Sequence, residues 1–271
     1  MNDVFVANGV AYEVGQLWSL KILDVSSFGS PTLLGSIDIP ASATSVDVAG
    51  DLAFMTVRSS GLHVVDVGDR TGPRFIGGCE TPGEAFDTRV AGGFAYVADG
   101  VAGLQVVDVA NPLAPSIVGS WTTASSALAV AMRQDLAFVA GDMGLEVVDV
   151  SVRSTPALYG KFRTSAGVSD VALVGDYAYL PVPGDGLLLV DVSAPASPRL
   201  AARFEMKGPF RSDFRIYADD EHVLLASGKT QVIEPLRLGL APDLQQALGG
   251  STQTYTVAWP AGAREPTVHC E

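Results

Sequence analysis

Histidine and cysteine are both scarce in this chain of 271 residues, which has three histidines and two cysteines. Cys79 and Cys270 are too few for a disulfide framework, and we expect them not to be bonded to each other. The three histidines, His63, His222 and His269, lie far apart in the sequence. The sequence therefore argues against a Ser-His-Asp catalytic arrangement and against a histidine-bound metal.

Basic residues are also in deficit, because 17 Lys and Arg face 30 Asp and Glu, for a net charge of −13. That charge repels phosphate backbones and anionic lipid surfaces, so nucleic acid is not expected as a partner. Apolar residues make up 48% of the chain, enough for a folded core. Charged or turn residues interrupt each apolar run before the about 18 residues that a membrane helix needs, so no transmembrane segment is expected.

An internal repeat dominates what the sequence does contain. An apolar run that ends in an acidic residue, such as Leu62-His63-Val64-Val65-Asp66, returns every 41 to 43 residues. A glycine precedes the run in the four best copies, and a proline follows the acidic residue by seven or eight positions. The acidic residues of the six copies are Asp24, Asp66, Asp108, Asp149, Asp191 and Glu234. We interpret the five aspartates as caps of their own turns rather than as ligands.

Each repeat also contains an apolar hairpin upstream of the run, with turn residues such as Gly50-Asp51 at its tip. No stretch has sustained helical periodicity, and β-branched and aromatic residues fill the apolar positions. Four antiparallel strands in a repeat of about 42 residues are typical of a propeller blade. The prediction is an all-β, six-bladed β-propeller over residues 1–250, with units that start near residues 3, 45, 87, 129, 170 and 214. Residues 251–271 form a C-terminal extension, either an edge strand or the start of a truncated region.

The repeated run resembles the LVIVD repeat, a family of bacterial and archaeal propeller repeats named for an apolar run ending in Asp. The resemblance covers residues 3 to about 249, but Ser19 and Lys229 replace the expected glycine in the first and sixth copies. Members of this family are mostly secreted or cell-surface proteins of undefined activity. The resemblance therefore implies a secreted or cell-surface location, although no export signal is visible at Met1.

First strands line the channel of a propeller, and their opening positions hold Asp3, Ser45, Asp87, Ala129, Asp170 and Arg215. Carboxylates thus occupy alternate units, and Asp3, Asp87 and Asp170 could together hold a hard cation such as Ca²⁺. In the alternative interpretation these carboxylates cap turns or pair with arginines. The candidate arginines are Arg89, Arg133, Arg211 and Arg215.

The loops from fourth to first strands and from second to third strands share one face, which holds most of the loop variation. Trp18 interrupts one of these loops and is either a packing plug or an aromatic contact for a sugar or small ligand. Our leading hypothesis is a non-catalytic, extracellular, monomeric propeller that binds a protein or a glycan through this face. The alternative is an enzyme of hydrolase or lyase type with an Asp/Arg site at the channel mouth, and a third interpretation is a purely architectural ring.

Overall fold

The computed structural model describes residues 3–15, 18–27, 30–39, 41–204, 214–218, 222–227, 234–237, 243–248 and 251–256. These residues fall into two compact units, Met1–Val130 with Val150–Ala157, and Ala131–Asp149 with Leu158–Glu271. The described residues include no helix that is both long and apolar enough to cross a membrane.

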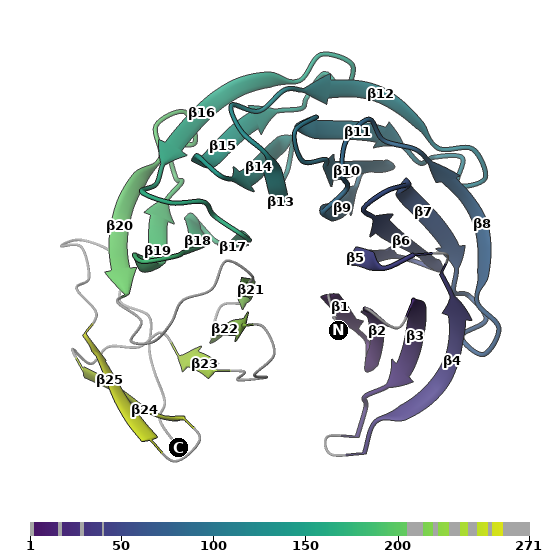
Figure 1. Ribbon diagram of the computed structural model, residues 1–271, viewed down its shortest axis with the longest axis horizontal. Helices are drawn as coiled ribbons and strands as arrows, with labels where there is room; N and C mark the ends of the chain where they lie inside the picture. Colours follow the sequence, from purple (N-terminus) through teal and green to yellow (C-terminus); the bar gives the residue numbers. More distant parts are fainter. Residues whose placement is uncertain are drawn as a thin grey trace. The chain divides into compact units, whose positions relative to one another are not determined.

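Five four-stranded antiparallel sheets follow one another along the chain (Figure 1). In each sheet the strands pair in sequence order, so every connection between neighbours is a hairpin or short loop. The first three sheets are β1 (Asp3–Ala7), β2 (Val10–Val14), β3 (Ser19–Asp24) and β4 (Thr32–Asp38); β5 (Ala43–Ala49), β6 (Leu52–Val57), β7 (Gly61–Asp66) and β8 (Arg74–Cys79); and β9 (Asp87–Ala91), β10 (Phe94–Ala98), β11 (Leu104–Asp108) and β12 (Ser116–Trp121). The next two are β13 (Ala127–Arg133), β14 (Leu136–Gly141), β15 (Gly144–Asp149) and β16 (Ala157–Arg163); and β17 (Ala172–Val174), β18 (Tyr177–Val182), β19 (Gly186–Asp191) and β20 (Arg199–Phe204).

The predicted hairpins are confirmed in all five sheets, because tight turns join each first strand to its second strand. These turns need left-handed backbone, which glycine and asparagine adopt at low cost. Asn8 and Gly9 have φ values of 51° and 74°, and Gly92 and Gly93 have values of 60° and 81°.

The repeated apolar run forms the third strand of each sheet. Its aspartate caps the turn that follows, as predicted, at Asp24, Asp66, Asp108 and Asp191. The Asp66 carboxylate accepts the N–H of Gly68 at 3.0 Å, and the Asp108 carboxylate accepts the N–H of Ala110 at 2.9 Å. The Asp24 carboxylate accepts both the hydroxyl and the N–H of Ser26, and these bonds lower its pKa. These aspartates therefore have a structural role in their own turns.

Fourth strands carry a second periodic feature, a glycine on which the next sheet rests. A Cβ at Gly77 would lie 2.1 Å from the carbonyl oxygen of Pro112, and a Cβ at Gly119 would lie 2.0 Å from that of Arg153. Gly35 and Gly160 meet the following sheet in the same way. In the second sheet the pairing between β7 and β8 shifts register between Val64 and Val65, so the residue of β8 before Gly77 forms a β-bulge. Bulges of this kind twist an exposed strand edge and discourage pairing with other chains.

The cores are apolar layers between consecutive sheets. Phe54, Leu62 and Val64 from the second sheet pack with Ala95 and Val97 from the third. Cys79 is half-buried at the rim of this layer with a free thiol, and burial raises its pKa. Cys270, which we expected not to be bonded to Cys79, lies outside the described residues.

A sixth four-stranded sheet is not formed by the described residues. Strands β21 (Phe214–Ala218), β22 (His222–Ser227) and β23 (Glu234–Arg237) make a three-stranded sheet, while β24 (Asp243–Leu248) pairs with β25 (Ser251–Thr256). In the first sheet Val10 pairs with the motif residue Asp24, but the corresponding His222 pairs with Arg237. The third strand is therefore displaced by three residues from Glu234, which the sequence had placed at its end.

Candidate functional site

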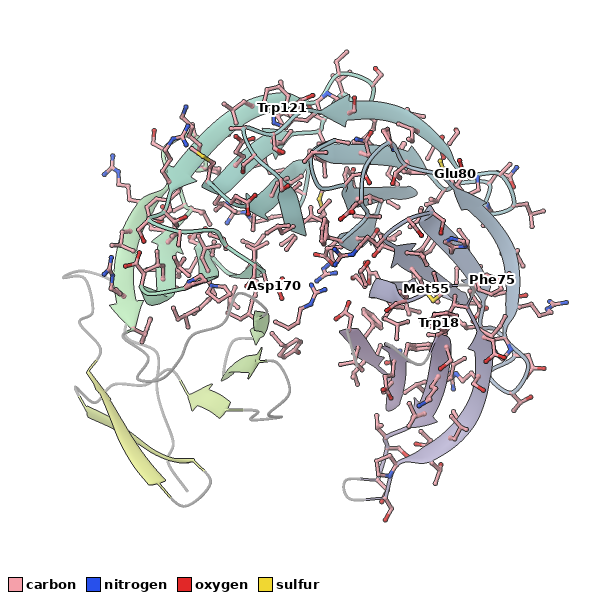
Figure 2. All side chains as sticks on the ribbon, viewed as in Figure 1. Trp18, Met55, Phe75, Glu80, Trp121 and Asp170 are labelled. Atoms are coloured by element: carbon pink, nitrogen blue, oxygen red, sulfur yellow. The ribbon has the colours of Figure 1, made fainter. Side chains whose placement is uncertain are left out.

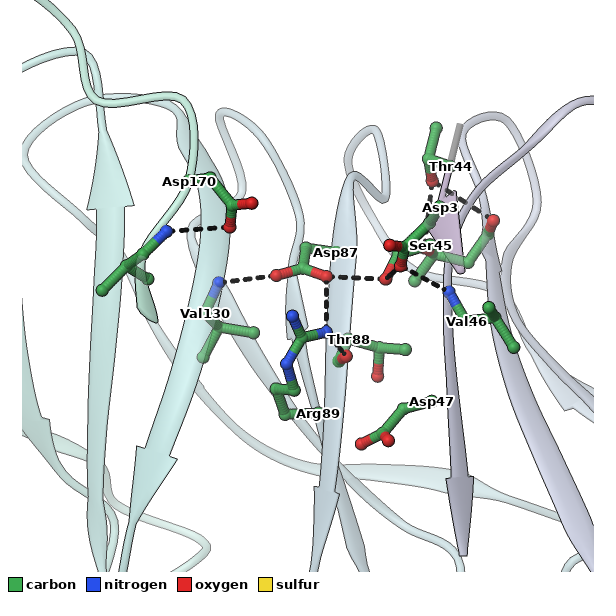
Figure 3. Close-up of polar contacts among 12 residues, drawn as sticks. Asp3, Thr44, Ser45, Val46, Asp47, Asp87, Thr88, Arg89, Val130 and Asp170 are labelled. Atoms are coloured by element: carbon green, nitrogen blue, oxygen red, sulfur yellow. Dashed lines mark hydrogen bonds and ion pairs between the residues drawn. The ribbon is translucent and has the colours of Figure 1, made fainter. Parts of the chain in front are cut away.

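Carboxylates on the first strands join consecutive sheets, and we call each such bond a carboxylate latch (Figure 3). In every latch an aspartate in a first strand or just before it accepts a backbone N–H of the next first strand. The donor-acceptor pairs are Val46 to Asp3 at 3.0 Å, Val130 to Asp87 at 2.9 Å and Ile216 to Asp170 at 2.8 Å. The sequence alignment of these first strands is thereby confirmed, since all three donors lie one position after the aligned opening position.

A fourth latch was missed by the sequence analysis. Asp47 lies two residues after Ser45, and its carboxylate accepts the N–H of Val90 at 2.7 Å. Burial raises the pKa of Asp47, although the nearby Arg89 charge and hydrogen bonds from Val90 and Val48 act in the opposite direction. The sequence did contain a signal for this role of Asp47, because residues two apart on a strand, such as Ser45 and Asp47, lie on the same face of the sheet.

Ser45 connects two latches within the first unit. Its hydroxyl oxygen lies 2.7 Å from Asp3 Oδ2 and 2.6 Å from Asp87 Oδ1, as Figure 3 shows. Arg89 also donates to Asp87 Oδ1 at 2.9 Å, so the expected arginine pairing is present for this carboxylate. The Asp87 side chain is fully buried, and both of its oxygens accept hydrogen bonds from the protein.

Arg133 takes a different place from the other predicted site residues. It ends β13 at the turn side of its sheet, and its guanidinium donates to the carbonyl oxygens of Gly175 at 3.1 Å and Val192 at 2.7 Å. It also lies 3.6 Å from the exposed carboxylate of Asp176. Because Ala129 occupies the opening position of β13, Arg133 supplies a link to the following sheet from the opposite end of the strand.

The other predicted residues divide between the two units. Asp170, labelled in Figure 2, belongs to the second unit, where its two carboxylate oxygens accept the N–H groups of Val171 and Ile216. Arg215 is half-buried on β21 in the same unit, and Arg211 lies outside the described residues. Within the part of the chain that the structure describes, no three or more Asp, Glu, His or Cys side chains are grouped so as to hold a metal ion.

Trp18 lies in the loop between β2 and β3, and 57% of its surface is exposed. Its φ of 52° is left-handed, a conformation that bulky side chains rarely adopt and that costs roughly 1–3 kcal/mol. Two backbone bonds hold it there: its N–H donates to Gly15 at 3.3 Å, and its carbonyl accepts from Ile39 at 2.7 Å. More than half of the Trp18 surface is therefore exposed, on a backbone that two hydrogen bonds hold in place.

Within the first unit, the β6–β7, β8–β9 and β10–β11 loops lie at the same ends of their strands as the β2–β3 loop of Trp18, and we call this surface the loop face. The N–H of Ala85, in the loop between β8 and β9, donates to the carbonyl of Arg58, in the turn between β6 and β7. That loop also donates to Asp99 through Thr81 at 2.6 Å and Gly83 at 2.9 Å. Asp99 is fully buried, and this burial raises the pKa of its carboxyl. The hydrogen bonds from Thr81 and Gly83 act in the opposite direction and lower it. A rigid loop face suits binding without large rearrangement.

The sheets and their links define an all-β repeat protein, consistent with a β-propeller. The family model described as LVIVD repeat matches residues 2–39, 40–81, 82–123, 124–164 and 167–205, and the chain belongs to this family. No curated protein matches the chain. Among solved structures, the crystal structure of the computationally designed Ika8 protein is similar in fold, with a TM-score of 0.64 and 9% identity. That similarity covers 87% of this chain and 70% of the designed chain.

Proposed function

We propose that this protein is a non-catalytic binding protein that engages a partner protein or a glycan through the loop face. The exposed Trp18 is the main support for the proposal. Two backbone bonds hold it in a strained left-handed conformation, which reduces the stability of the fold. Such strain is typical of residues that bind a ligand or partner. Tryptophan and arginine are the residues most enriched at binding hot spots. Arg58 lies on the same face with its guanidinium 4.5 Å from the ring centre of Phe86.

The composition of the loop face favours a protein partner over a glycan. Val101, at the tip of the turn between β10 and β11, is 81% exposed. Apolar side chains of this kind add binding energy against apolar partner side chains, whereas a sugar offers mainly stacking on aromatic rings. The buried Asp87 and Asp170 carboxylates, by contrast, support the sheets through backbone N–H groups, which favours binding over acid-base chemistry at those residues.

Paired binding experiments test this function. Immobilised wild type and Trp18→Ala should be compared on a glycan microarray and in pull-downs whose captured proteins are identified by mass spectrometry. Trp121→Phe is the matched control, because Trp121 is half-buried on the outer strand β12 (Figure 2). We expect one identified ligand to bind wild type and the control but to lose at least tenfold in affinity to Trp18→Ala. Equal binding by all three proteins to every ligand would contradict the proposal.

We also propose that residues 214–248 complete a six-bladed propeller. The latch between Asp170 and Ile216 supports this, because it gives β21 the same register as the earlier first strands. Val4 on β1 is 41% exposed, whereas the equivalent Val46 on β5 is only 2% exposed, so the first sheet has one face without a neighbour in its own unit. Hydrogen exchange should protect the Ile216 amide as strongly as those of Val46 and Val130, and fast exchange at Ile216 would refute a sixth blade.

A further inference from the structure

The outer strands β16 and β20 of the second unit carry four cationic side chains and no carboxylate, in a protein of net charge −13. The cations are Lys161, Arg163, Arg199 and Arg203, and all four are exposed. We call these four residues the basic strip. The corresponding strands of the first unit have serine or glycine at the positions of Lys161 and Arg203, namely Ser36, Gly78 and Ser120. The strip is therefore a departure from the repeat and not a requirement of the fold.

Part of this charge is already offset within the second unit. Arg203 lies 3.0 Å from Asp185, and Arg199 adds to the hydrogen bonds from Ser193 that lower the pKa of Asp191. Lys161 and Arg163 have no ion-pair partner among the residues the structure describes. The unpaired charge of the strip is thus concentrated on β16.

Apolar side chains lie among these cations. Leu158, Tyr159 and Leu200 are 42%, 48% and 48% exposed. The two strands belong to consecutive sheets that touch at Gly160, where a Cβ would lie 2.1 Å from the carbonyl oxygen of Pro195. The basic strip and these apolar side chains therefore form one surface within the second unit.

We propose that the basic strip and its apolar neighbours are a docking surface for an acidic segment of another protein that also carries apolar side chains. Charge complementarity selects the acidic partner, since cations within about 8 Å of one another act together at physiological ionic strength. The exposed leucines and tyrosine select a protein, because an acidic polysaccharide supplies carboxylates without apolar side chains. This surface is distinct from the loop face.

Side chains rather than strand addition carry the proposed contact. The β19–β20 pairing shifts register between Leu189 and Val190, which places a bulge in the outer strand. The loop that holds Pro195 also rests on β16 at Gly160. Both features interrupt the regular row of backbone groups that an added strand would need.

A labelled 12-residue peptide of alternating Glu and Leu is the test ligand, measured by fluorescence anisotropy. The comparison ligands are a Glu/Ser peptide of equal charge and polygalacturonate. The test variant is Lys161→Glu with Arg163→Glu, and the matched control is Arg70→Glu with Arg74→Glu, which changes the net charge equally on the first unit. Lys161→Gln with Arg163→Gln provides a milder variant, and circular dichroism checks that every variant is folded.

We expect wild type to bind the Glu/Leu peptide more tightly than either comparison ligand, with affinity that falls as salt rises. The test variant should lose at least tenfold in affinity, the Gln variant should lose less, and the control should stay within about threefold of wild type. Absence of binding by wild type, equal loss in the control, or tighter binding of polygalacturonate would each overturn the proposal.

Discussion

Both units contain carboxylate latches, and the second unit adds a link of opposite chemistry. In the first unit, β1, β5 and β9 each present a carboxylate to a backbone N–H of the next first strand. The second unit keeps one such latch, from Asp170 to Ile216. It also contains Arg133, which at the far end of β13 donates to two backbone carbonyls of the following sheet. The first-strand aspartates therefore act as latches, and their alternation does not by itself indicate a ligand site.

The largest effect should come from breaking a latch in the first unit. Asp87→Ala leaves the Val130 N–H and Arg89 without their buried acceptor. We expect a loss of about 3–5 kcal/mol in the free energy of unfolding, measured by urea denaturation. Asp108→Ala, which removes only a turn cap, is the control and should cost about 1 kcal/mol. A loss for Asp87→Ala no greater than that of the control would refute the latch.

The corresponding break in the second unit should be smaller. Arg133→Met keeps an apolar stem over Phe138, which the guanidinium now covers at 5.1 Å, but removes both bonds to carbonyl oxygens. We expect a loss of about 1.5–3 kcal/mol in urea denaturation. Asp176→Asn should cost less than about 1 kcal/mol, because Asp176 is exposed and its ion pair is screened. Equal losses in the two variants would show that the ion pair, rather than the carbonyl bonds, holds the sheets.

Close approach of sheets at the fourth strands gives a further contrast. Gly77→Ala places a methyl group against the Pro112 carbonyl and should cost about 1–3 kcal/mol of unfolding free energy. The fifth sheet has Ala202 at this position, so Ala202→Gly should relieve no clash and should cost only about 0.5–1 kcal/mol. Thermal unfolding of both variants checks this difference, and a harmless Gly77→Ala would contradict the close contact.

The smallest effect concerns pH. Burial raises the pKa of Asp47 in the folded state, so the folded protein binds a proton at Asp47 more readily than the unfolded chain does. The contribution of Asp47 to stability should therefore grow as pH falls from 7 through its raised pKa toward the ordinary carboxyl range. Measured against Asp47→Asn, wild type should gain relative stability on acidification. A relative loss would contradict the buried state of this carboxylate.

The sequence predicted the features that recur within one sheet. The third strands, the hairpin turns and the turn-capping role of Asp24, Asp66 and Asp108 depend on local spacing and are confirmed. Alignment of the first strands also placed Asp3 and Asp87 correctly, because equivalent positions in successive sheets face equivalent neighbours.

Features that depend on contact between sheets were harder to predict. The fourth-strand glycines keep the repeat period, but only the structure shows a carbonyl from the next sheet against Gly35 or Gly77. Asp47 and Arg133 were missed as links because each stands alone at its repeat position. The displacement of β23 could not be seen either, since Glu234 fits the period while the backbone pairing of His222 with Arg237 does not.

Thermal unfolding in the presence of EDTA and of excess CaCl₂ tests most directly whether Asp87 is a latch or a cation ligand. As a latch, Asp87 accepts bonds from Ser45, Arg89 and Val130 without a metal. The account predicts one Tm for wild type in both solutions, and an equally lowered Tm for Asp87→Asn in both. A Ca²⁺-dependent rise in the Tm of wild type that Asp87→Asn abolishes would contradict it.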